Sequence, residues 1–421
     1  MPSREEIIDA LQFAFLNSKD PINDTTDPVY TITYQYAGTS EPTDWEFSST
    51  YSGWTEFTAA EKTAIRDMMD HIETLINVEF VEDTSTSDPD LNLGKVTLAG
   101  STAGVGGYSA SSSGSTITRY DAYAVFDNTI DISSGDDDLI VHELGHALGL
   151  KHPFDAPALP TDVDTQKWTV MSYTENPDNG VDSTAMQAYD ILALQDLWGQ
   201  NDDTASGDDT YTGSRTSTID SVWDSGGIDT FDGSAVGSGV TIDLREGKFS
   251  NFSGIDDVSI AYDTVIENAI GGGGKDKLTG NSTDNTVEGG GGRDKIYGNG
   301  GLDKLLGQGG VDRIWGGNGA DIIKGGGGKD TIYGEKGKDK LWGDGKADTF
   351  VFEDDGGYDI IKDFENDLDV LMIDHADFSS EAEFLALGKD KGGNAVFNLT
   401  DGKIKVIGIS VSDLSDDVDV V

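Results

Sequence analysis

The feature that most constrains the fold is a nine-residue repeat between Gly271 and Val351. Its consensus is Gly-Gly-x-Gly-x-Asp-x-U-x, where x is any residue and U is large and apolar. The sixth position is Asp in every unit except the second, where it is Asn285, and the eighth position is apolar in all units. A strict period of this kind indicates a solenoid whose turns stack on one another. A flexible glycine-rich linker is the alternative, but it has no need of a periodic apolar position.

Rows of aspartates on stacked turns would repel one another unless a cation neutralises them. Carboxylate and backbone carbonyl oxygens are the ligands that Ca²⁺ prefers, so the repeats predict several structural calcium ions. The second unit lacks most of the consensus and is expected to bind no ion. The predicted ligands are Gly272, Gly274, Asp276, Gly290, Gly292, Asp294, Gly301, Asp303, Gly310, Asp312, Gly317, Gly319, Asp321, Gly326, Gly328, Asp330, Gly337, Asp339 and Asp348.

The charge of the chain restricts its partners. It has 28 Lys and Arg against 78 Asp and Glu, a net charge of −50, so nucleic acid and anionic membranes are poor partners. Bound cations or a saline medium must offset the repulsion. The chain has no Cys, which excludes disulfides and thiolate ligands. A secreted protein of this kind would depend on metal ions to stabilise its fold.

The N-terminal residues do not resemble a signal peptide, because Arg4, Glu5 and Glu6 precede a short apolar stretch that contains Asp9. Residues 1–28 read as an amphipathic helix followed by a break. This segment is either a removable pro-segment or a docked first helix. No run approaches 18 apolar residues, so no membrane span is expected.

A second motif, between His142 and His152, contains candidate metal ligands. Three of the five histidines fall within eleven residues, and His142 and His146 are spaced to project from one face of a helix. Gly149 lets the chain leave the helix with a positive φ, so that His152 swings back as a third ligand. Three neutral imidazoles leave the fourth position of a tetrahedral Zn²⁺ open for water, which is typical of a catalytic site. Glu143 is then placed to take a proton from that water.

The alternative for this stretch is an ordinary buried helix. Two internal glycines argue against it, because each costs about 1 kcal/mol relative to alanine. The sequence predicts the following elements around it: a strand at 29–36, a helix at 58–76 that begins with a capping box, strands at 78–81, 96–99 and 123–126, a loop at 100–115, and a helix at 188–198 that ends at a glycine. Residues 123–126 are expected beside the metal, where they could pair with a substrate peptide by strand addition.

His142 to Pro153 reads His-Glu-Leu-Gly-His-Ala-Leu-Gly-Leu-Lys-His-Pro, and Met171-Ser172-Tyr173 follows it. The motif HExxHxxGxxH with a Met-Ser-Tyr turn resembles the metzincin metalloproteases, and the full stretch resembles their serralysin branch. The resemblance implies that Met171 forms a turn beneath the zinc. It also implies that Tyr173 is an extra zinc ligand, which can leave the metal and stabilise the oxyanion.

The resemblance extends toward the C-terminus. Segments at 221–230 and 265–270 are similar to the start of a serralysin β-roll, and the similarity implies calcium ligands at Asp224, Gly226, Gly227, Asp229 and Glu267. The ending at 416–421 has an acidic residue followed by terminal hydrophobics. It resembles the uncleaved C-terminal signal of Gram-negative type I secretion, and the alternative is an ordinary edge strand.

Together these features predict an α+β zincin-like catalytic domain at 29–202, with a zinc helix and a twisted sheet. A parallel β-roll, or β-solenoid, follows at 203–421, with repeats at 271–351 and a cap with the secretion signal at 352–421. The expected protein is a secreted, monomeric, calcium-dependent zinc endopeptidase with one catalytic Zn²⁺ and several structural Ca²⁺. Its expected partners are extracellular protein and peptide substrates, a proteinaceous inhibitor and the type I secretion machinery.

The alternative is a catalytically inactive calcium-binding adhesive or scaffold protein. A repeat-bearing lipase is disfavoured because the chain has no Gly-x-Ser-x-Gly motif.

Overall fold

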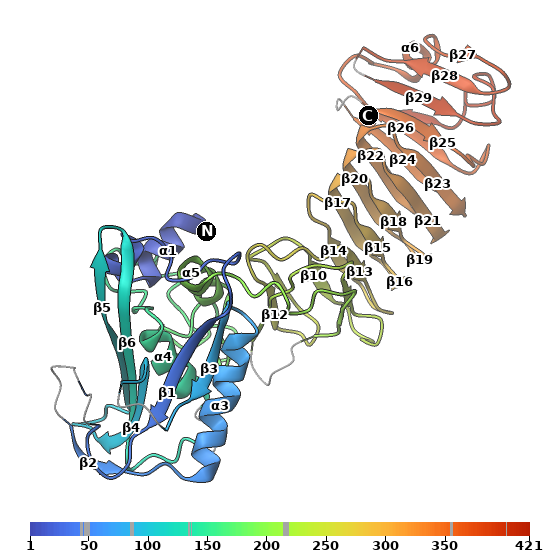
Figure 1. Cartoon of the computed structure of the whole chain (residues 1–421). Coiled ribbons are helices and arrows are strands. Elements are labelled where there is room, and N and C mark those ends of the chain that lie inside the picture. Colours follow the sequence, from blue (N-terminus) through green and yellow to red (C-terminus); the bar gives the residue numbers. More distant parts are fainter. Residues whose placement is uncertain are drawn as a thin grey trace. The chain divides into compact units, whose positions relative to one another are not determined.

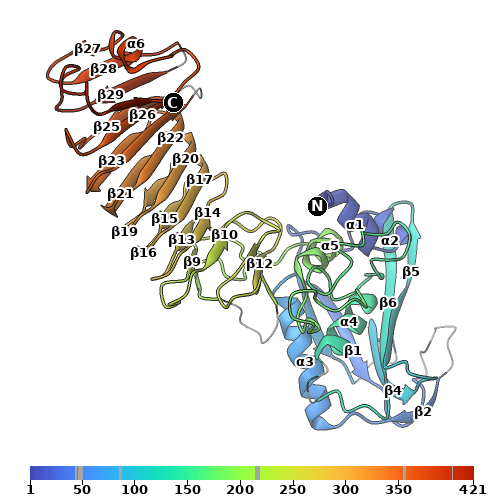
Figure 2. The ribbon, with the colours of Figure 1, turned by 180° about the vertical axis from the view of Figure 1, so that it is seen from behind.

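The structure is a computed structural model that describes residues 1–42, 45, 51–84, 88–133, 135, 137–213, 219–353, 357–400 and 402–421. The chain divides into two compact units (Figures 1 and 2). The first contains Met1–Ser206, Ser214–Gly226 and Ser259–Thr264, and the second contains Gly207–Gly213, Gly227–Val258 and Val265–Val421. The domain boundaries inferred from the sequence remain predictions.

A mixed sheet forms the framework of the first unit, with the strand order β3-β1-β4-β6-β5 and β2 paired to β4. Its pairs are parallel except for β2 with β4 and β5 with β6, so β5 is an antiparallel edge strand. Its strands are β1 (Tyr30–Tyr36), β2 (Ser52–Thr55), β3 (Val78–Glu82), β4 (Leu91–Thr97), β5 (Gly104–Ser113) and β6 (Thr116–Asp127). The short strand β8 (Asp220–Val222) does not belong to this sheet.

The helices of this unit are α1 (Arg4–Leu11), α2 (Ala14–Asn17), α3 (Ala59–Glu73), α4 (Asp137–Ala147) and α5 (Ala188–Trp198). The helices expected at 58–76 and 188–198 are confirmed. Thr58 and Glu61 form the expected capping box of α3, which buries Ile65, Met69 and Ile72. Helix α4 contacts β5, β6 and α3, and α1 contacts α5. The N-terminal helix is therefore docked in the core.

Two expectations for this unit are wrong. The N-terminal segment is not one helix, because the chain leaves α1 at Gln12, which forms an isolated antiparallel bridge with Leu150. The segment at 100–115 is not a loop, because β5 pairs with β6 along its length. Its composition is rich in Gly and Ser, which are poor strand formers, and pairing with a long neighbouring strand overrides that local preference.

The second unit is a parallel β-roll. Successive turns of the repeat contribute strands to two sheets, and within each sheet a strand lies in parallel register with the strand 18 residues further along the chain. One sheet has the order β10-β14-β17-β20-β22-β24-β26-β30, and the other contains β13-β15-β18-β21-β23-β25. The apolar residue at the eighth position of each repeat is fully buried, which confirms the solenoid. These residues are Leu278, Val287, Ile296, Leu305, Ile314, Ile323, Ile332, Leu341 and Phe350.

The elements of the roll are β7 (Thr210–Tyr211), β9 (Thr230–Asp232), β10 (Thr241–Asp243), β11 (Phe249–Ser250), β13 (Asn268–Ile270), β14 (Lys277–Thr279), β15 (Thr286–Glu288), β16 (Gly291–Gly292), β17 (Lys295–Gly301), β18 (Lys304–Leu306), β19 (Gly309–Gly310), β20 (Arg313–Gly319), β21 (Ile322–Gly328), β22 (Thr331–Gly337), β23 (Lys340–Gly345), β24 (Thr349–Glu353), β25 (Tyr358–Ile361), β26 (Val370–Asp374), α6 (Glu381–Leu385), β27 (Lys389–Asp390), β28 (Ala395–Asn398), β29 (Lys403–Val406) and β30 (Val418–Val420). The short strand β12 (Val258–Ile260) includes residues of both units.

The C-terminal strand β30 pairs in parallel with β26 and ends its sheet, so the segment that resembles a secretion signal is ordered as an edge strand. Among the described residues, no helix is long and apolar enough to cross a membrane.

Candidate metal centre

Helix α4 and the turn after it bring the three predicted zinc ligands together. His142 and His146 lie one turn apart on a helix that is buried from Ile140 to Ala147. Gly149 has a φ of +103°, which ends the helix and lets the chain turn back. The Nε2 atoms of His146 and His152 are then 3.1 Å apart. One ring nitrogen from each of His142, His146 and His152 falls within a set whose members lie within 4.8 Å of one another.

Backbone carbonyls orient two of the rings. His142 Nδ1 donates to Val170 O at 2.8 Å, and His146 Nδ1 donates to Leu150 O at 2.9 Å. Because each Nδ1 carries the proton, each Nε2 is left with a lone pair. This is the tautomer that a metal-binding histidine requires.

Burial also sets the protonation of these rings. It lowers the pKa of His142 to about 4 and that of His146 to about 3, and it lowers the pKa of His152 as well. His142 and His146 are therefore uncharged near pH 7. Lone pairs of His146 and His152 that face each other at 3.1 Å are favourable only with a cation or a shared proton between them.

Glu143 lies on the same helix turn and faces strand β5. Burial raises the pKa of its carboxyl group to about 8, although a hydrogen bond from the backbone of Gly106 opposes that shift. Its Oε2 atom is buried and has no hydrogen-bond partner among the described residues. The side chain borders a hollow of about 450 Å³, which Tyr173 and Gly104 also line. A carboxylate in this position can exchange a proton with a molecule bound in the hollow.

The close approach of β5 to α4 depends on glycines. A Cβ at Gly106 would lie 2.2 Å from the backbone oxygen of Glu143, and a Cβ at Gly104 would lie 2.6 Å from its carboxylate. These two glycines therefore let the edge strand reach the site.

Residues 123–126, which were expected to pair with a substrate peptide, lie in β6 and are hydrogen-bonded to β4 on one side and to β5 on the other. That expectation is wrong, because the strand has no free edge. The edge strand beside the site is β5.

Met171 and Tyr173 lie where the sequence motif suggested. Met171 is fully buried, and a Cβ at Gly145 would lie 2.7 Å from its sulfur, so the methionine packs directly beneath α4. The Tyr173 hydroxyl is 2.7 Å from His152 Nε2, while 69% of the tyrosine remains exposed. The Tyr173 ring also packs against the rings of His142 and His152, with centroid separations of 5.6 and 4.7 Å.

Asp190 supports the site from α5 and was not recognised in the sequence. Its buried carboxylate accepts hydrogen bonds from Thr169 Oγ1 at 2.6 Å and Val170 N at 2.8 Å. Val170 is the residue whose carbonyl holds His142. Asp190 also accepts a hydrogen bond from Gln187 N, at the residue that precedes α5. In the sequence, an acidic residue at this place indicates a helix cap and gives no sign of a role in the metal centre.

The N-terminal segment holds the turn that carries the third histidine. Lys151 N donates to Leu11 O at 2.7 Å, and Phe13 N donates to Gly149 O at 3.4 Å. No pattern in the sequence indicates these contacts, because they join segments that are more than 130 residues apart.

The roll contains the second group of predicted ligands, and the aspartates form two rows. In each row the backbone N–H of one aspartate donates to Oδ1 of the aspartate one turn further on, as from Asp294 N to Asp312 Oδ1 at 2.9 Å and from Asp303 N to Asp321 Oδ1 at 2.9 Å. In six aspartates of these rows, the other carboxylate oxygen, Oδ2, is buried and has no hydrogen-bond partner among the described residues. These are Asp294, Asp303, Asp312, Asp321, Asp330 and Asp339.

Burial raises the pKa of these carboxyl groups, to about 6 for Asp294 and to about 7 for Asp303 and Asp312. The turns between them depend on glycine, since Gly290, Gly317 and Gly326 have φ values between +92° and +101°. The predicted glycine ligands thus occupy the turns beside the aspartate rows.

The first turns of the two rows differ. Asp276 accepts hydrogen bonds on both oxygens, from Val240 N and Gly272 N. In the divergent second unit, the amide of Asn285 donates to Glu267 O and Asn281 Oδ1. These two turns satisfy their side chains with protein hydrogen bonds.

The ligand set implied at the start of the roll is split between the units. Asp224 and Gly226 belong to the first, where Gly226 N donates to Asp224 Oδ1 at 3.0 Å. Gly227, Asp229 and Glu267 belong to the second, where Asp229 N donates to Glu267 Oε2 at 2.8 Å.

Comparisons with known proteins agree with this architecture. A family model described as the serralysin C-terminal domain of M10 peptidases matches residues 188–417. Serralysin from Proteus mirabilis is 43% identical over 176 residues, which cover 35% of this chain and 36% of the relative. Serralysin G from Dickeya chrysanthemi is 40% identical over 184 residues, which cover 38% and 39%. Metallopeptidase AprA from Pseudomonas marginalis is 33% identical over 280 residues, which cover 56% and 57%.

The matches thus span between about a third and just over half of the length of these relatives. Among solved structures, the extracellular lipase LipA from Serratia marcescens matches over 37% of this chain and 40% of its own. Its TM-score of 0.20 and identity of 17% are too low to define a shared fold. Since the family model covers more than half of the residues, the chain belongs to the serralysin family of M10 peptidases.

Proposed function

We propose that the protein is a secreted zinc endopeptidase that hydrolyses peptide bonds of extracellular proteins. The observation that carries this proposal is the cluster of three neutral imidazoles beside the buried Glu143 carboxyl group. An adhesive or scaffold protein has no use for a buried carboxyl oxygen without a partner among the described residues, beside three clustered histidines, two of which are oriented by backbone carbonyls. The residues of the first unit fit the zincin-like catalytic domain expected from the sequence.

The ligand cluster meets the requirements of zinc. The oriented Nε2 lone pairs of His142 and His146, together with His152, supply three nitrogen ligands and leave one side open toward the hollow. When bound, Zn²⁺ supplies Lewis acidity that activates a water molecule and polarises the scissile carbonyl.

The remaining steps depend on protein side chains. Glu143 takes the proton of the attacking water and later passes it to the leaving amine. The Tyr173 hydroxyl moves away from His152 and donates to the developing oxyanion. The edge strand β5 orients the substrate peptide by strand addition, since its Gly104 lines the hollow.

The test is Glu143→Gln. We expect the variant to keep zinc and its circular dichroism spectrum but to lose casein hydrolysis by about 10² to 10⁴-fold, which is the typical contribution of general-base catalysis. Full activity in this variant would refute the mechanism. Casein hydrolysis by the wild type that a zinc chelator does not inhibit would refute the zinc proposal, and no hydrolysis at all would favour an inactive scaffold.

We also propose that the roll binds several Ca²⁺ ions. The six buried Oδ2 atoms without partners support this, because a buried carboxylate oxygen requires a hydrogen bond or a cation. Hard oxygen ligands in glycine turns suit Ca²⁺. The second repeat is expected to bind no ion of its own, because the amide of Asn285 already bonds to Glu267 O and Asn281 Oδ1.

Export through a type I pathway, with the roll folding outside the cell when it meets calcium, fits the ending at β30 that resembles a secretion signal. The remaining partners are protein substrates and a proteinaceous inhibitor, and the protein is expected to act as a monomer. A folded, fully active enzyme in calcium-free buffer would contradict the calcium proposal.

A further inference from the structure

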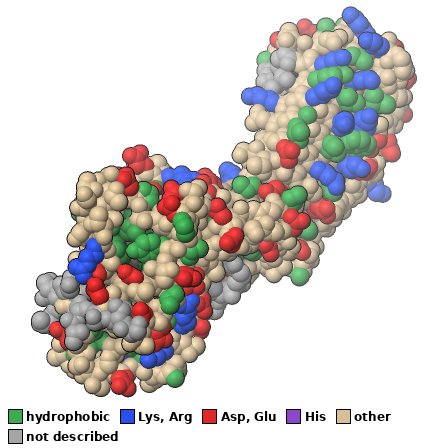
Figure 3. All heavy atoms as spheres, viewed as in Figure 1, with side chains coloured by type: hydrophobic (Ala, Val, Ile, Leu, Met, Phe, Trp, Pro, Cys, Tyr) green, Lys and Arg blue, Asp and Glu red, His purple; other side chains and the backbone are tan. Residues whose placement is uncertain are grey.

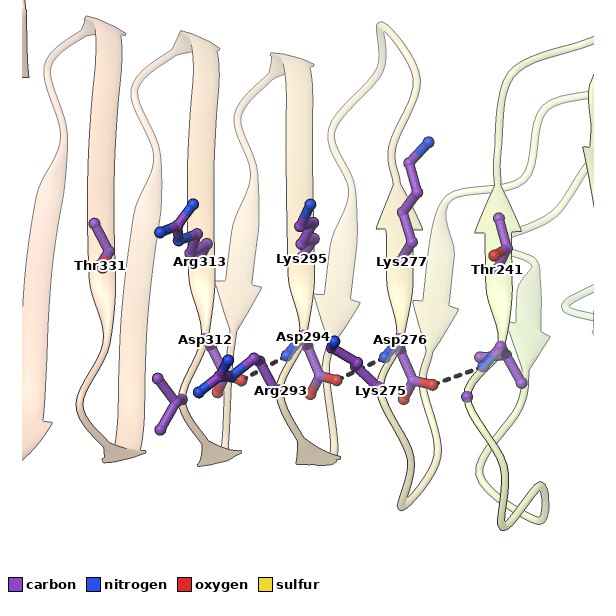
Figure 4. Close-up of a pocket in the computed structure, with 13 residues that line it drawn as sticks. Thr241, Lys275, Asp276, Lys277, Arg293, Asp294, Lys295, Asp312, Arg313 and Thr331 are labelled. Carbon is purple, nitrogen blue, oxygen red and sulfur yellow. Dashed lines mark hydrogen bonds between the residues drawn. The ribbon is translucent and has the colours of Figure 1, made fainter.

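The outer face of the β10-β14-β17-β20-β22 part of the roll carries a cationic groove of about 650 Å³. We define the basic groove by its five basic lining residues: Lys275, Lys277, Arg293, Lys295 and Arg313 (Figure 4). Three aspartates, Asp276, Asp294 and Asp312, also line it. Twelve of the 28 Lys and Arg of the chain lie between Gly271 and Val351. Figure 3 shows one face of the molecule on which Lys and Arg side chains gather over the second unit. A concentration of this kind is unexpected in a chain with a net charge of −50.

The five cations are unpaired. Acidic residues outnumber basic ones almost threefold, yet no described residue forms a hydrogen bond or an ion pair with any of these five side chains. Asp294 and Asp312 line the same groove and accept backbone hydrogen bonds on Oδ1, and among the described residues neither forms an ion pair with the five side chains. The cations are therefore free to meet a ligand.

The cations of the basic groove recur at a regular interval along the roll. Lys277 on β14 is in register with Lys295 on β17, and Lys295 is in register with Arg313 on β20. Neighbouring strands lie about 4.8 Å apart, so one cation recurs at that interval along the roll. Lys275 and Arg293 form a second row, beside the aspartates (Figure 4). A periodic track of cations suits a linear polymer that carries one anionic group per unit.

The net charge of the chain does not prevent such binding. At about 0.15 M salt the Debye length is about 8 Å, so exposed acidic groups further away are largely screened. Within the groove itself, five basic residues against three aspartates leave a formal net charge of +2.

Aromatic residues on the same strands indicate the kind of polymer. Tyr297, Trp315 and Tyr333 stack on one another, with centroid separations of 4.6 and 5.2 Å and interplanar angles of 5° and 13°. Their inner faces are covered, so the ladder offers mainly ring edges, whereas proteins that bind single-stranded nucleic acid offer open faces on which bases stack. A second hollow of about 490 Å³ on these strands is lined by Tyr297, Trp315, Asn299 and Asn318, and also by Glu335, Lys336 and Glu353. Amides and phenols suit sugar hydroxyls.

We propose that this face of the roll binds an acidic polysaccharide, with its carboxylates on the basic groove and its hydroxyl groups toward the amide and phenol side chains. The surface would hold the protein on a carboxylated matrix. The proposal does not rest on the protease activity, since none of the residues involved belongs to the imidazole cluster.

The test measures binding of the full-length chain, in calcium-containing buffer, to polygalacturonate. The variant K277Q/K295Q/R313Q is expected to bind about tenfold more weakly than the wild type and to show a shallower salt dependence, since three exposed ion pairs contribute about 0.2 to 1 kcal/mol each. The matched control is K304Q/K324Q/K340Q, which removes the same charge from three exposed lysines on β18, β21 and β23 of the other sheet. The control is expected to bind within about twofold of the wild type. Unchanged circular dichroism and casein hydrolysis show that both variants are folded.

Three results would overturn the proposal. The first is no salt-sensitive binding of polygalacturonate by the wild type, and the second is an equal loss in both triple variants, which would indicate a general charge effect. The third is binding of poly-glutamate or oligo-dT as tight as that of polygalacturonate, which would assign the groove to another class of polymer. Because the readout is polymer binding, each of these results leaves the protease proposal untouched.

Discussion

The imidazole cluster of the first unit and the aspartate rows of the second are both suited to metal ions. They differ in the charge and the hydrogen-bond partners of their side chains when no metal is bound. Burial keeps His142 and His146 neutral, with pKa values of about 4 and 3, and backbone carbonyls bind their Nδ1 atoms. In the rows, burial raises the pKa of Asp303 and Asp312 to about 7, and their Oδ2 atoms have no partner among the described residues. The first site buries no charge when empty, whereas each row needs protons or cations.

The two proposed metals would therefore act on different properties of the protein. Zinc would add chemistry to a site that is already assembled by α4, Val170 and Asp190. Calcium binding would stabilise the folded roll, because the buried carboxylate oxygens of the rows otherwise have no partner among the described residues. Three predictions, in order of decreasing expected effect, test this difference between the two sites.

The largest expected effect is that of removing each metal separately at pH 7.5. A calcium-selective chelator should abolish most of the β signal of the roll in far-ultraviolet circular dichroism, because the unpartnered carboxylates repel one another. A zinc chelator should abolish casein hydrolysis and leave the spectrum unchanged. Loss of secondary structure on zinc removal alone, or none on calcium removal, would break the comparison.

The second prediction concerns the pH dependence of the calcium-free roll. The folded pKa values of Asp294, at about 6, and of Asp303, Asp312 and Asp348, at about 7, lie above the unfolded value of about 4. Folding therefore favours the protonated form, so this contribution to stability is full below about pH 4 and is lost as the pH rises through 6 to 7.

In calcium-free buffer, circular dichroism should accordingly show a more stable roll at pH 4 than at pH 8, and saturating calcium should reduce the difference. A calcium-free roll that becomes more stable as the pH rises from 4 to 8 would contradict the assignment. The calcium-loaded protein is the control, because its carboxylates have a partner at both pH values.

The smallest expected effect is that of Asp190→Asn in the first unit. The substitution replaces one acceptor oxygen of the group that holds Thr169 Oγ1 and Val170 N, and Val170 O orients His142. Loss of such a supporting contact typically lowers metal affinity about 10- to 100-fold. A competition assay with a chromogenic chelator would measure zinc affinity.

Asp196→Asn is the matched control, because Asp196 is an exposed residue on the same helix and bonds to Gln12 instead. It should leave zinc affinity unchanged. Equal effects of the two substitutions would show that α5 acts through general stability and that Asp190 does not orient the site.

Much of this molecule could be predicted from the spacing of residues that lie close together in the sequence. A nine-residue period can be satisfied only by stacked turns, so the buried apolar positions from Leu278 to Phe350 followed directly from it. The four- and ten-residue separations of His146 and His152 from His142 likewise predicted one cluster, because a helix and a glycine turn are local structures. Each of these features depends on residues that are close together in the chain.

Contacts between distant segments could not be read in this way. The Gly- and Ser-rich composition of residues 100–115 predicted a loop, whereas this stretch contains strand β5. Residues 123–126 were therefore expected to have a free edge, but β5 pairs with them on that side. Asp190 resembles a helix cap in the sequence, yet in the structure it also supports the turn that holds His142.

The sequence alone thus determined the periodic roll and the identity of the histidine cluster, because both depend on short-range geometry. Only the tertiary structure decided which strand borders the site, which carboxylate supports it and which lysines form a groove. These features depend on strand pairing and on close approach between parts of the chain that no local period relates. Lys277, Lys295 and Arg313 are each 18 residues from the next, and only the parallel register of the roll brings them into one row.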